Sequence, residues 1–462
     1  MISKRNALQD SAKIERRLPP KTVGLPVAGS LFKFLKDPLK FLIEARANYG
    51  DIYSLDLGVT DIVILNHPRQ ADYVLRKNFR NYNKGGAMWK TVRTVLGNGL
   101  GTSEGDFWRR QRRMIQPLFH RKHLNVLTDM MVDVIDEQVT GWQGYAKQKP
   151  FNVAHALHPI TMKVIVKTMF GTGIDDEDLN AVSQSAAFIN DYIPRGMLTS
   201  FLPAWIPLPG RHHYATCIRT VDRVVQNVIE RRRQLSDHNH SDLLTMMLHT
   251  EDAETGERMT DKQLRDEAVT MFLSGYDTTA GTLTWVFHIL TQYPEVTAKL
   301  QKEVDEILGK GRPSLADLSQ LTYSRMVIQE TMRLYPPLWW VSRTATEDDE
   351  IDGFYIKAGT MVAPMPYVIH RHPAIWDNPN KFDPERFSRE RFKARHKLAW
   401  LPFGAGQRQC IGRDFSIMES QLILARILQN YKITAVPGNV AQLKVSTTLK
   451  TQKGVFINLE QR

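Results

Sequence analysis

Apolar residues recur at three- and four-residue spacing over long stretches of this chain, which is the period of one face of a helix. The longest such pattern runs over 261–293, inside a region from 106 to 308 that is mainly helical. Shorter helices are predicted over 38–49 and 67–76. A further helical pattern covers 413–429, where one face carries Phe415, Met418, Leu422, Ala425 and Leu428.

Alternating apolar and polar residues predict strands near both ends of the chain. Residues 51–65 are typical of a hairpin of two strands, while 341–368 and 432–459 give further short strands. Residues 81–105 carry six glycines and little periodicity, so we predict a loop that lines a ligand site. Prolines and glycines over 194–210 predict a break in the helical region.

These elements predict a mainly α-helical protein with small β-sheets, an α+β arrangement with a large helical lobe and a smaller β-rich lobe. The hydrophobic content of 42% is enough for a large core. No linker, repeat or low-complexity tract divides residues 1–462, so we predict a single domain. Residues 1–20 are predicted to form a polar lead-in to it.

The stretch from Phe403 to Gly412, FGAGQRQCIG, holds one of only two cysteines and directly precedes the helical pattern at 413. Cys410 is therefore predicted at a helix entry, where unpaired N–H groups and the helix dipole lower the pKa of a thiol. The glycines allow tight turns beside a flat ligand, and Arg408 offers a guanidinium to a carboxylate. Taken alone, a lone cysteine is more often a small buried hydrophobic residue.

The complete pattern F-G-x-G-x-R-x-C-x-G resembles the haem-binding loop of the cytochrome P-450 family, the haem-thiolate monooxygenases. The resemblance implies a haem b cofactor (iron protoporphyrin IX) with the Cys410 thiolate as the axial ligand of its iron. The haem is then expected between the long central helix and the helix that follows Cys410. Phe403, Arg408 and Gly412 are implied to contact it.

The segment MFLSGYDTTA, from Met271 to Ala280, lies in the middle of the longest helical pattern. A glycine and paired threonines are locally unfavourable there and predict a bend that opens room for a small ligand. Considered alone, the segment is equally a kinked helix with two ordinary polar residues. It resembles the oxygen-binding groove of the family, with Ser274 where alanine or glycine is more usual. The resemblance implies that Asp277 and Thr278 deliver protons during activation of O2.

Glu330 and Arg333 have the i, i+3 spacing of an ordinary helical salt bridge. They precede the segment FDPERF, which contains Arg386. This order resembles the E-x-x-R helix of the family and its later P-E-R-F partner. The resemblance implies that Glu330, Arg333 and Arg386 form a buried network that braces the cysteine loop.

Trp108 and Arg112 lie one turn apart on a predicted helix and match the family's W-x-x-x-R pair. The resemblance implies that both contact a haem propionate, and Arg343 matches a further propionate-binding arginine. Two neighbours, Arg109 and Arg113, have two interpretations. They form either a solvated basic face or a docking surface for an acidic ferredoxin or flavodoxin.

By the resemblance, the substrate pocket is lined by mostly apolar side chains from several separate segments. Its predicted members are Met88, Trp89, Met271, Phe272, Ser274, Leu338, Trp339, Val341 and Thr448. Each residue is also compatible with an ordinary core position. Together they predict a hydrophobic small-molecule substrate such as a fatty acid or a terpenoid.

The formal net charge is +12, which is compatible with nucleic acid, an anionic membrane surface or an acidic protein partner. No zinc-ligand spacing, helix-turn-helix signature or lysine-rich tail favours nucleic acid, so an acidic protein is favoured. No apolar run reaches the roughly 18 residues of a membrane span. Two cysteines make no disulfide framework. We expect a cytoplasmic protein of bacterial type, although a chain trimmed of an N-terminal anchor has the same pattern.

The expected activity is insertion of one atom of O2 into a C–H bond of the hydrophobic substrate. Too few residues follow Cys410 for a flavin or iron–sulfur domain, so electrons from NAD(P)H are expected through a reductase and a separate ferredoxin or flavodoxin. Two alternatives stay open: a haem-thiolate enzyme that is driven by peroxide or needs no redox partner, and a haem sensor or carrier without turnover. The Asp277–Thr278 pair argues against both, because such enzymes tend to lose it and a carrier needs no proton relay.

Overall fold

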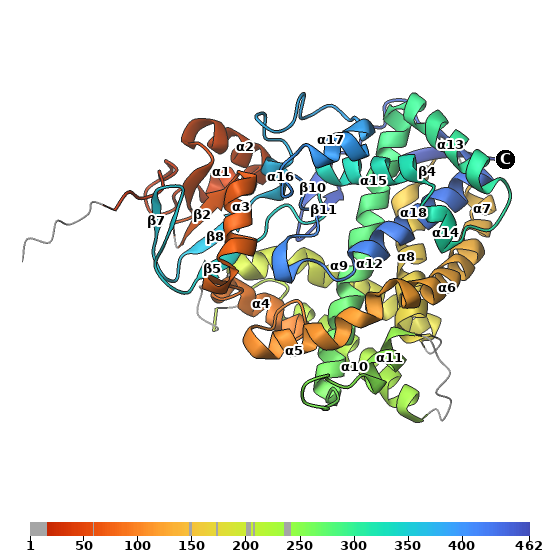
Figure 1. Cartoon of the computed structure of the whole chain (residues 1–462), viewed down its shortest axis with the longest axis horizontal. Helices are drawn as coiled ribbons and strands as arrows, with labels where there is room; N and C mark the ends of the chain where they lie inside the picture. The colour runs from red at the N-terminus through yellow and green to blue at the C-terminus, as the bar shows by residue number, and fades with distance from the viewer. Residues whose placement is uncertain are drawn as a thin grey trace, which may run out of the picture.

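Long helices build most of the molecule, and the small sheets lie at its periphery (Figure 1). The computed structural model describes residues 16–58, 60–146, 150–171, 174–199, 205–206, 208–234 and 242–462. The α-helices are α1 (Leu31–Lys36), α2 (Pro38–Tyr49), α3 (Pro68–Asp72), α4 (Ala87–Leu96), α5 (Gly105–Ile115), α6 (Arg121–Thr140), α7 (Gln143–Ala146), α8 (Val153–Phe170), α9 (Asp176–Leu198), α10 (Arg211–Gln234), α11 (Leu243–His249), α12 (Asp261–Gln292), α13 (Pro294–Leu308), α14 (Leu315–Leu318), α15 (Thr322–Leu334), α16 (Pro366–Ile369), α17 (Arg389–Lys393) and α18 (Arg413–Asn430). Across the described ranges, no helix has the length and apolar content needed to cross a bilayer. The predicted fold class, mainly α with small sheets, is confirmed.

The strands form one larger sheet near the N-terminus and three small ones. They are β1 (Ile52–Asp56), β2 (Asp61–Leu65), β3 (Tyr82–Asn83), β4 (Phe151–Asn152), β5 (Arg343–Ala345), β6 (Asp349–Ile351), β7 (Phe354–Ile356), β8 (Met361–Pro364), β9 (Tyr431–Ala435), β10 (Leu443–Val445), β11 (Leu449–Thr451) and β12 (Phe456–Gln461). The larger sheet has the order β1-β2-β8-β5-β3, with β2 and β8 parallel. The predicted hairpin at 51–65 is the antiparallel β1–β2 pair, in which Ile52 faces Leu65. The other sheets are β4-β12-β9, β10-β11 and β6-β7.

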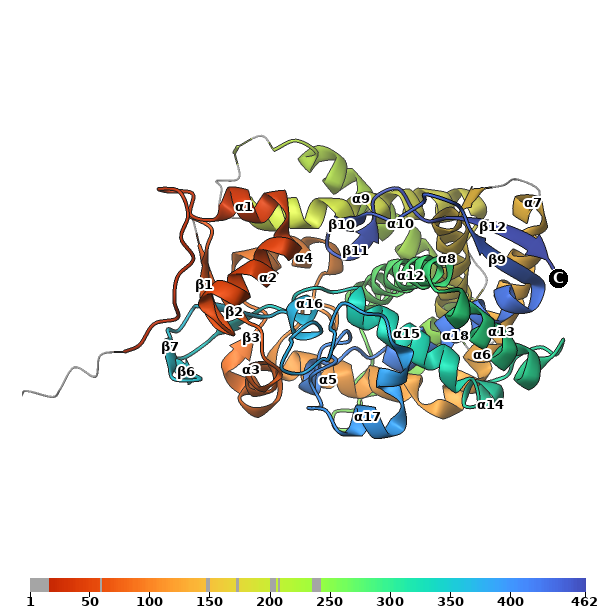
Figure 2. The same cartoon turned by 90° about the horizontal axis from the view of Figure 1, so that it is seen from above.

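Helix α12 runs through the centre of the molecule and packs against α8, α10, α15 and α18 (Figure 2). Its start is fixed by a capping box, in which the Thr260 hydroxyl accepts from the Gln263 N–H and the Gln263 side chain accepts from the Thr260 N–H. The helix continues to Gln292 without a break at Gly275. Gly275 instead allows close packing with α8, because a Cβ on it would lie 2.8 Å from Ile165 Cδ1.

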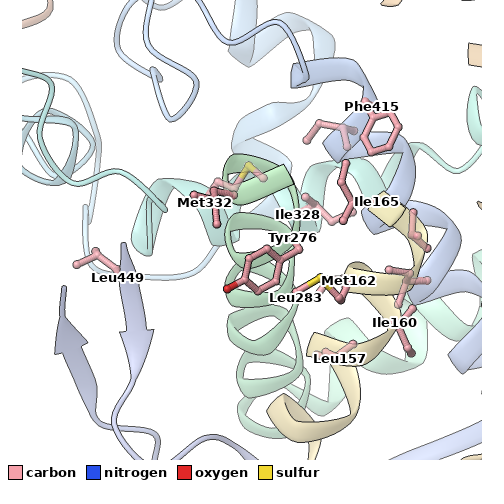
Figure 3. Close-up of a cluster of buried hydrophobic side chains, with 14 of the residues drawn as sticks. Leu157, Ile160, Met162, Ile165, Tyr276, Leu283, Ile328, Met332, Phe415 and Leu449 are labelled. Carbon is pink, nitrogen blue, oxygen red and sulfur yellow. The ribbon is translucent and has the colours of Figure 1, made fainter. Parts of the chain in front are cut away.

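Buried apolar side chains join these helices into a continuous core. Figure 3 shows part of it, with side chains from α8, α12, α15 and α18 packed around the middle of α12. Its labelled members are Leu157, Ile160, Met162, Ile165, Tyr276, Leu283, Ile328, Met332, Phe415 and Leu449. The helix that carries the predicted oxygen-binding residues is thus fixed on several sides.

Of the two predictions about chain breaks, one is wrong and one is confirmed. Residues 81–105 were expected to be a loop, but they contain β3 and the ten-residue helix α4. The glycines stand at the ends of that helix: Gly86 is its N-cap and Gly97 its C-cap, with φ of 84° and 57°. The predicted break over 194–210 is confirmed, since α9 ends at Leu198 and α10 begins at Arg211, although Pro194 itself still lies inside α9.

A buried ion-pair network connects α15 to the segment before α17. The Arg333 guanidinium donates to both carboxylate oxygens of Glu330, from Nε at 2.6 Å and from Nη2 at 2.8 Å. Arg386 Nε lies 3.4 Å from Glu330 Oε1. Arg333 also donates to the carbonyls of His370 and Pro379, at 2.8 and 2.6 Å. The structure therefore brings the three predicted network residues together and uses them to hold two irregular segments against α15.

Replacing Arg333 with Met should lower the free energy of unfolding, because it leaves the Glu330 carboxylate buried without its bidentate partner. Removing one member of a buried pair costs roughly 3–5 kcal/mol. Thermal unfolding measures the effect. The matched control is Arg391→Met, which removes a more exposed arginine from its pair with Asp383. Equal unfolding midpoints for the two variants would contradict the bracing role.

Candidate haem site

The loop that carries Cys410 is a tight, closed turn before α18. Its Cys410 N–H donates to the Phe403 carbonyl oxygen at 2.9 Å, across the short 3-10 helix η5 (Gly406–Arg408). Gly406 has a φ of 71°, and a Cβ there would lie 2.0 Å from the Leu75 carbonyl oxygen. Because only glycine fits this position, the loop can lie directly against the segment after α3.

The Cys410 side chain has an exposed surface, yet protein surrounds it deeply enough for desolvation to dominate its acidity. Burial raises the pKa of the thiol above its ordinary value, although the Gly412 N–H and the Arg112 and Arg413 guanidiniums act in the opposite direction. The predicted lowering of this pKa is therefore wrong for the protein groups alone. A bound metal ion deprotonates a coordinating thiol, so the missing stabilisation is what an iron centre provides.

Trp108 and Arg408 are stacked beside the loop. The Arg408 guanidinium lies 3.8 Å from the centroid of the Trp108 ring. It forms an ion pair with Glu104 and donates to the Ser103 carbonyl at 2.7 Å. Burial lowers the pKa of Arg408 to about 10, against the effect of Glu104. Arg408 is thus fixed by α5 and the residues just before it.

Next to this pair the structure concentrates positive charge in its interior. Arg343, on β5, is buried, and Nη1 donates to the neighbouring Ser342 carbonyl at 2.7 Å. Burial, followed by the charge of Arg408, lowers the pKa of Arg343 to about 10. Lys84 donates to the Gly101 carbonyl at 2.5 Å, and burial with the charges of Arg343 and Arg408 depresses its pKa strongly. Such a cluster is suited to an anionic ligand.

Lys84 was missed by the sequence analysis, since a single lysine in a glycine-rich stretch gives no signal of its own.

Arg112 differs in position from the other cations. Its Nη1 donates to the Gln409 carbonyl at 2.9 Å and its Nε to Gln116 Oε1 at 3.0 Å. Arg112 therefore braces the peptide immediately before Cys410.

The predicted oxygen-binding residues lie one turn apart on α12. Ser274 is exposed although it is in the middle of a central helix, and Thr278 is half-buried. Thr278 Oγ1 donates to the Ser274 carbonyl at 2.7 Å. Ser274 and Thr278 together give α12 a small, solvent-accessible polar face.

Asp277 points elsewhere. Its carboxylate is buried, with Oδ2 accepting from Thr448 Oγ1 at 3.1 Å and Oδ1 lying 3.0 Å from Lys450 Nζ. Both partners belong to the β10–β11 hairpin and the turn that joins its strands. The acid and the alcohol are adjacent in sequence, but successive residues of a helix point about 100° apart.

Glu419, on α18, is a buried carboxyl that the sequence analysis did not single out. Burial raises its pKa to about 8, and Thr279 of α12 hydrogen-bonds to it. Within the described ranges its Oε1 has no hydrogen-bond partner. The signal was a lone glutamate on the buried face of the 413–429 helical pattern.

The predicted pocket residues do not share one environment. Met88, Met271, Phe272, Trp339 and Thr448 are buried, Leu338 and Ser274 are exposed, and Trp89 and Val341 are intermediate. The Phe272 ring packs against Phe170 and Tyr276, which places it in the core beside α8. Trp339 lines an outer groove of about 980 Å³ beside α1 and α2, and its Nε1 donates to the Ser446 carbonyl.

The family model for cytochrome P450 matches residues 19–459. The chain belongs to the cytochrome P450 family. It is 35% identical to cyclooctat-9-en-7-ol 5-monooxygenase of Streptomyces melanosporofaciens, over 90% of this chain and 89% of the relative. It is 31% identical to pentalenene oxygenase of Streptomyces avermitilis, over 89% and 90%. The solved heme domain of cytochrome P450DA superposes with a TM-score of 0.87 at 26% identity, covering 97% of this chain and 98% of that one.

Haem bound through a cysteine thiolate is the cofactor of this cytochrome P450. The residues present fit that group. Cys410 offers the sulfur ligand on a tight loop, in which Gly406 leaves no room for a side chain. The buried Arg343 and the half-buried Lys84 and Arg408 fit carboxylates such as the haem propionates.

Replacing Arg343 with Met should act in opposite directions on the haem-free and haem-bound protein. Removing a buried, poorly paired charge should raise the unfolding midpoint of the haem-free chain, because desolvation of that charge is avoided. Loss of a charged hydrogen-bond donor should weaken haem binding by roughly 10- to 100-fold. Haem titration and thermal unfolding measure the two effects. Arg258→Met, which removes an exposed guanidinium from its surface pair with Glu251, is the control.

Proposed function

We propose that this cytochrome P450 hydroxylates a cyclic terpenoid, with O2 as co-substrate and with electrons from NAD(P)H that arrive through a ferredoxin or flavodoxin. The observation that carries the reaction class is Cys410, presented by a rigid loop beside a buried cation cluster and within a chain that matches the family almost end to end. The similarity of this chain to oxygenases of terpenoids supports the substrate class.

The residues of the chain bind and orient the haem and the substrate, and the haem performs the oxidation. When bound, the haem activates O2 and oxidises a C–H bond of the substrate. Cys410 would supply the sulfur ligand of the haem iron, while Arg343, Lys84 and Arg408 would hold its carboxylates. Ser274 and Thr278 place hydroxyl groups on the open face of α12. Asp277 adds a buried carboxyl group one residue before Thr278 in the sequence, and its proposed role is to relay protons toward that hydroxyl.

Electron delivery is proposed to use the groove beside α5. This groove has a volume of about 510 Å³ and includes Trp108, Arg109, Arg112 and Gln407 in its lining. The Arg109 side chain is 68% exposed, and its ion-pair partner among the described residues is the still more exposed Asp106. A carboxylate of an acidic partner can displace such a weak surface pair.

The interpretation of Arg113 as a docking residue does not fit the structure. Its guanidinium donates to both carboxylate oxygens of Asp252, and it also pairs with Glu254 at 2.6 Å. The neighbouring Arg110 pairs with Glu257 at 2.8 Å. These two arginines fasten α5 to the segment before α12, so the proposed dock rests on Arg109.

The reduced, CO-bound protein should show the red-shifted Soret band of thiolate ligation, and Cys410→Ser should lose it. A spin-state shift should follow addition of cyclooctat-9-en-7-ol or pentalenene, with lauric acid as the comparison ligand. Turnover under ¹⁸O2 should place one labelled oxygen in the terpenoid product. An ordinary Soret position would remove the reaction class, whereas a shift with lauric acid alone would remove the terpenoid assignment.

Arg109→Glu should slow reduction of the haem by an acidic ferredoxin on the order of tenfold at low salt, because the charge that attracts the partner is reversed. The difference should shrink as ionic strength rises. Stopped-flow trapping of the reduced protein with CO gives the rate. The control is Lys302→Glu, which reverses an equally exposed cation in a similar intrahelical pair on α13. Equal slowing by both variants would contradict a local dock.

A further inference from the structure

A ladder of four charged side chains joins α9 to α12 across the β10–β11 hairpin, with two lysines between two aspartates. At its inner end, the Lys450 ammonium lies 3.0 Å from Asp277 Oδ1 on α12. At its outer end, the Lys444 ammonium lies 2.8 Å from Asp191 Oδ2 on α9. Figure 2 shows β10 and β11 between these two helices. The order along the ladder is therefore Asp191, Lys444, Lys450, Asp277.

The two lysines occupy directly opposed positions of the hairpin. In its register, Lys444 faces Lys450, and their neighbours Val445 and Leu449 form the next pair. Like charges at opposed positions of an antiparallel pair destabilise it. In this hairpin each lysine is neutralised by an aspartate from a different helix. Each ion pair therefore also relieves the repulsion between the two lysines.

Hydrogen bonds fix the turn of the hairpin between the same two helices. The Thr447 hydroxyl donates to the Asn190 carbonyl at 2.7 Å, and the Ser446 hydroxyl donates to Asp191 Oδ1 at 3.1 Å. On the inner side, Thr448 donates to Asp277, and Trp285 Nε1 of α12 donates to the Leu449 carbonyl at 3.3 Å. The position of the hairpin is thus set by contacts with α9 and α12 together.

Burial differs sharply along the ladder. The Asp277 side chain is 3% exposed and that of Lys450 is 21% exposed, while Asp191 and Lys444 are 45% and 44% exposed. Other groups near Asp277 are less able to hold it. Within the described ranges the buried Tyr276 hydroxyl has no hydrogen-bond partner, and burial lowers the pKa of His158. Lys450 is therefore the group that connects the buried carboxylate with the outer, wetter end.

We infer that Lys450 is a positioning residue for proton delivery, and that α9 controls it through the Asp191–Lys444 pair. Lys450 holds the Asp277 carboxylate in one orientation against the β10–β11 hairpin, one residue before Thr278 in the sequence of α12. The outer pair keeps Lys444 from repelling Lys450 out of that position. This inference rests on the proposed function, because it assigns a regulation to the same proton-delivering acid.

Lys450→Met should raise the fraction of electrons lost as hydrogen peroxide severalfold, and Lys450→Arg should restore coupling to product. In the Asp277→Asn background, Lys450→Met should have no further effect, because Lys450 acts through that carboxylate. Lys453→Met, an exposed lysine three residues along, is the matched control. Additive effects of Lys450→Met and Asp277→Asn, or an equal effect of Lys453→Met, would overturn the role of Lys450.

The outer half of the ladder has its own test. Asp191→Asn leaves Lys444 unpaired opposite Lys450 and should raise the peroxide fraction about half as much as Lys450→Met, on the order of twofold. Adding Lys444→Met should bring this fraction back toward the wild-type value, because the unbalanced repulsion is removed. An Asp191→Asn/Lys444→Met variant that is no better coupled than Asp191→Asn would overturn the control by α9.

Failure of the ladder and failure of the proposed function give different results. Thermal unfolding of the haem-free chain measures a double-mutant cycle of Lys450→Met and Asp277→Asn that does not depend on turnover. The effects of the two substitutions on the free energy of unfolding should be non-additive there as well. Every ladder variant should keep the thiolate-type CO spectrum. A wild-type protein without that spectrum would refute the proposed function, while additivity in the haem-free cycle would refute the ladder.

Discussion

The concentration of positive charge in the interior beside Cys410 is the constraint on which the rest of the site depends. Arg343, Lys84 and Arg408 are held close together, and Glu104 is the carboxylate that the structure pairs with them. Buried like charges are unfavourable unless a counter-charge completes them. The thiol of Cys410 has the complementary deficit, since burial opposes its ionisation. One ligand that carries a metal cation and two carboxylates removes both penalties, so the protein is built to be completed by its haem.

Helix α12 has to satisfy several demands on different faces. On one face Gly275 admits Ile165 of α8 to close contact, which fixes the helix in the core. On another, Ser274 and Thr278 leave small polar groups beside open space. A third face turns Asp277 into the β10–β11 hairpin. The acid and the alcohol of the family pattern, Asp277 and Thr278, therefore contact different parts of the protein. Their cooperation depends on the hairpin residues that fix the Asp277 carboxylate.

Much of this arrangement follows from local sequence, and the parts that do not follow from it are long-range contacts. The helical patterns at 261–293 and 413–429 give α12 and α18 with an error of one residue at the C-terminal end, because periodicity and capping are local signals. Helix α4 was missed because the glycines at its two ends made the whole stretch 81–105 look like a loop. Arg113 was misread because its partner, Asp252, is remote in sequence and buried. The raised pKa of Cys410 has the same origin, since burial is not visible in a motif.

The positively charged side chains discussed above fall into groups with different locations and different partners. One group of cations faces the interior and fits carboxylates, and Arg109 faces a surface groove next to α5. Lys444 and Lys450 belong to neither group, because each is matched to an aspartate on a separate helix. The two proposals place electron entry on the α5 side of the site and control of proton delivery on the hairpin side. Since the two routes share no charged residue, a change in one set of charges can alter one supply without altering the other.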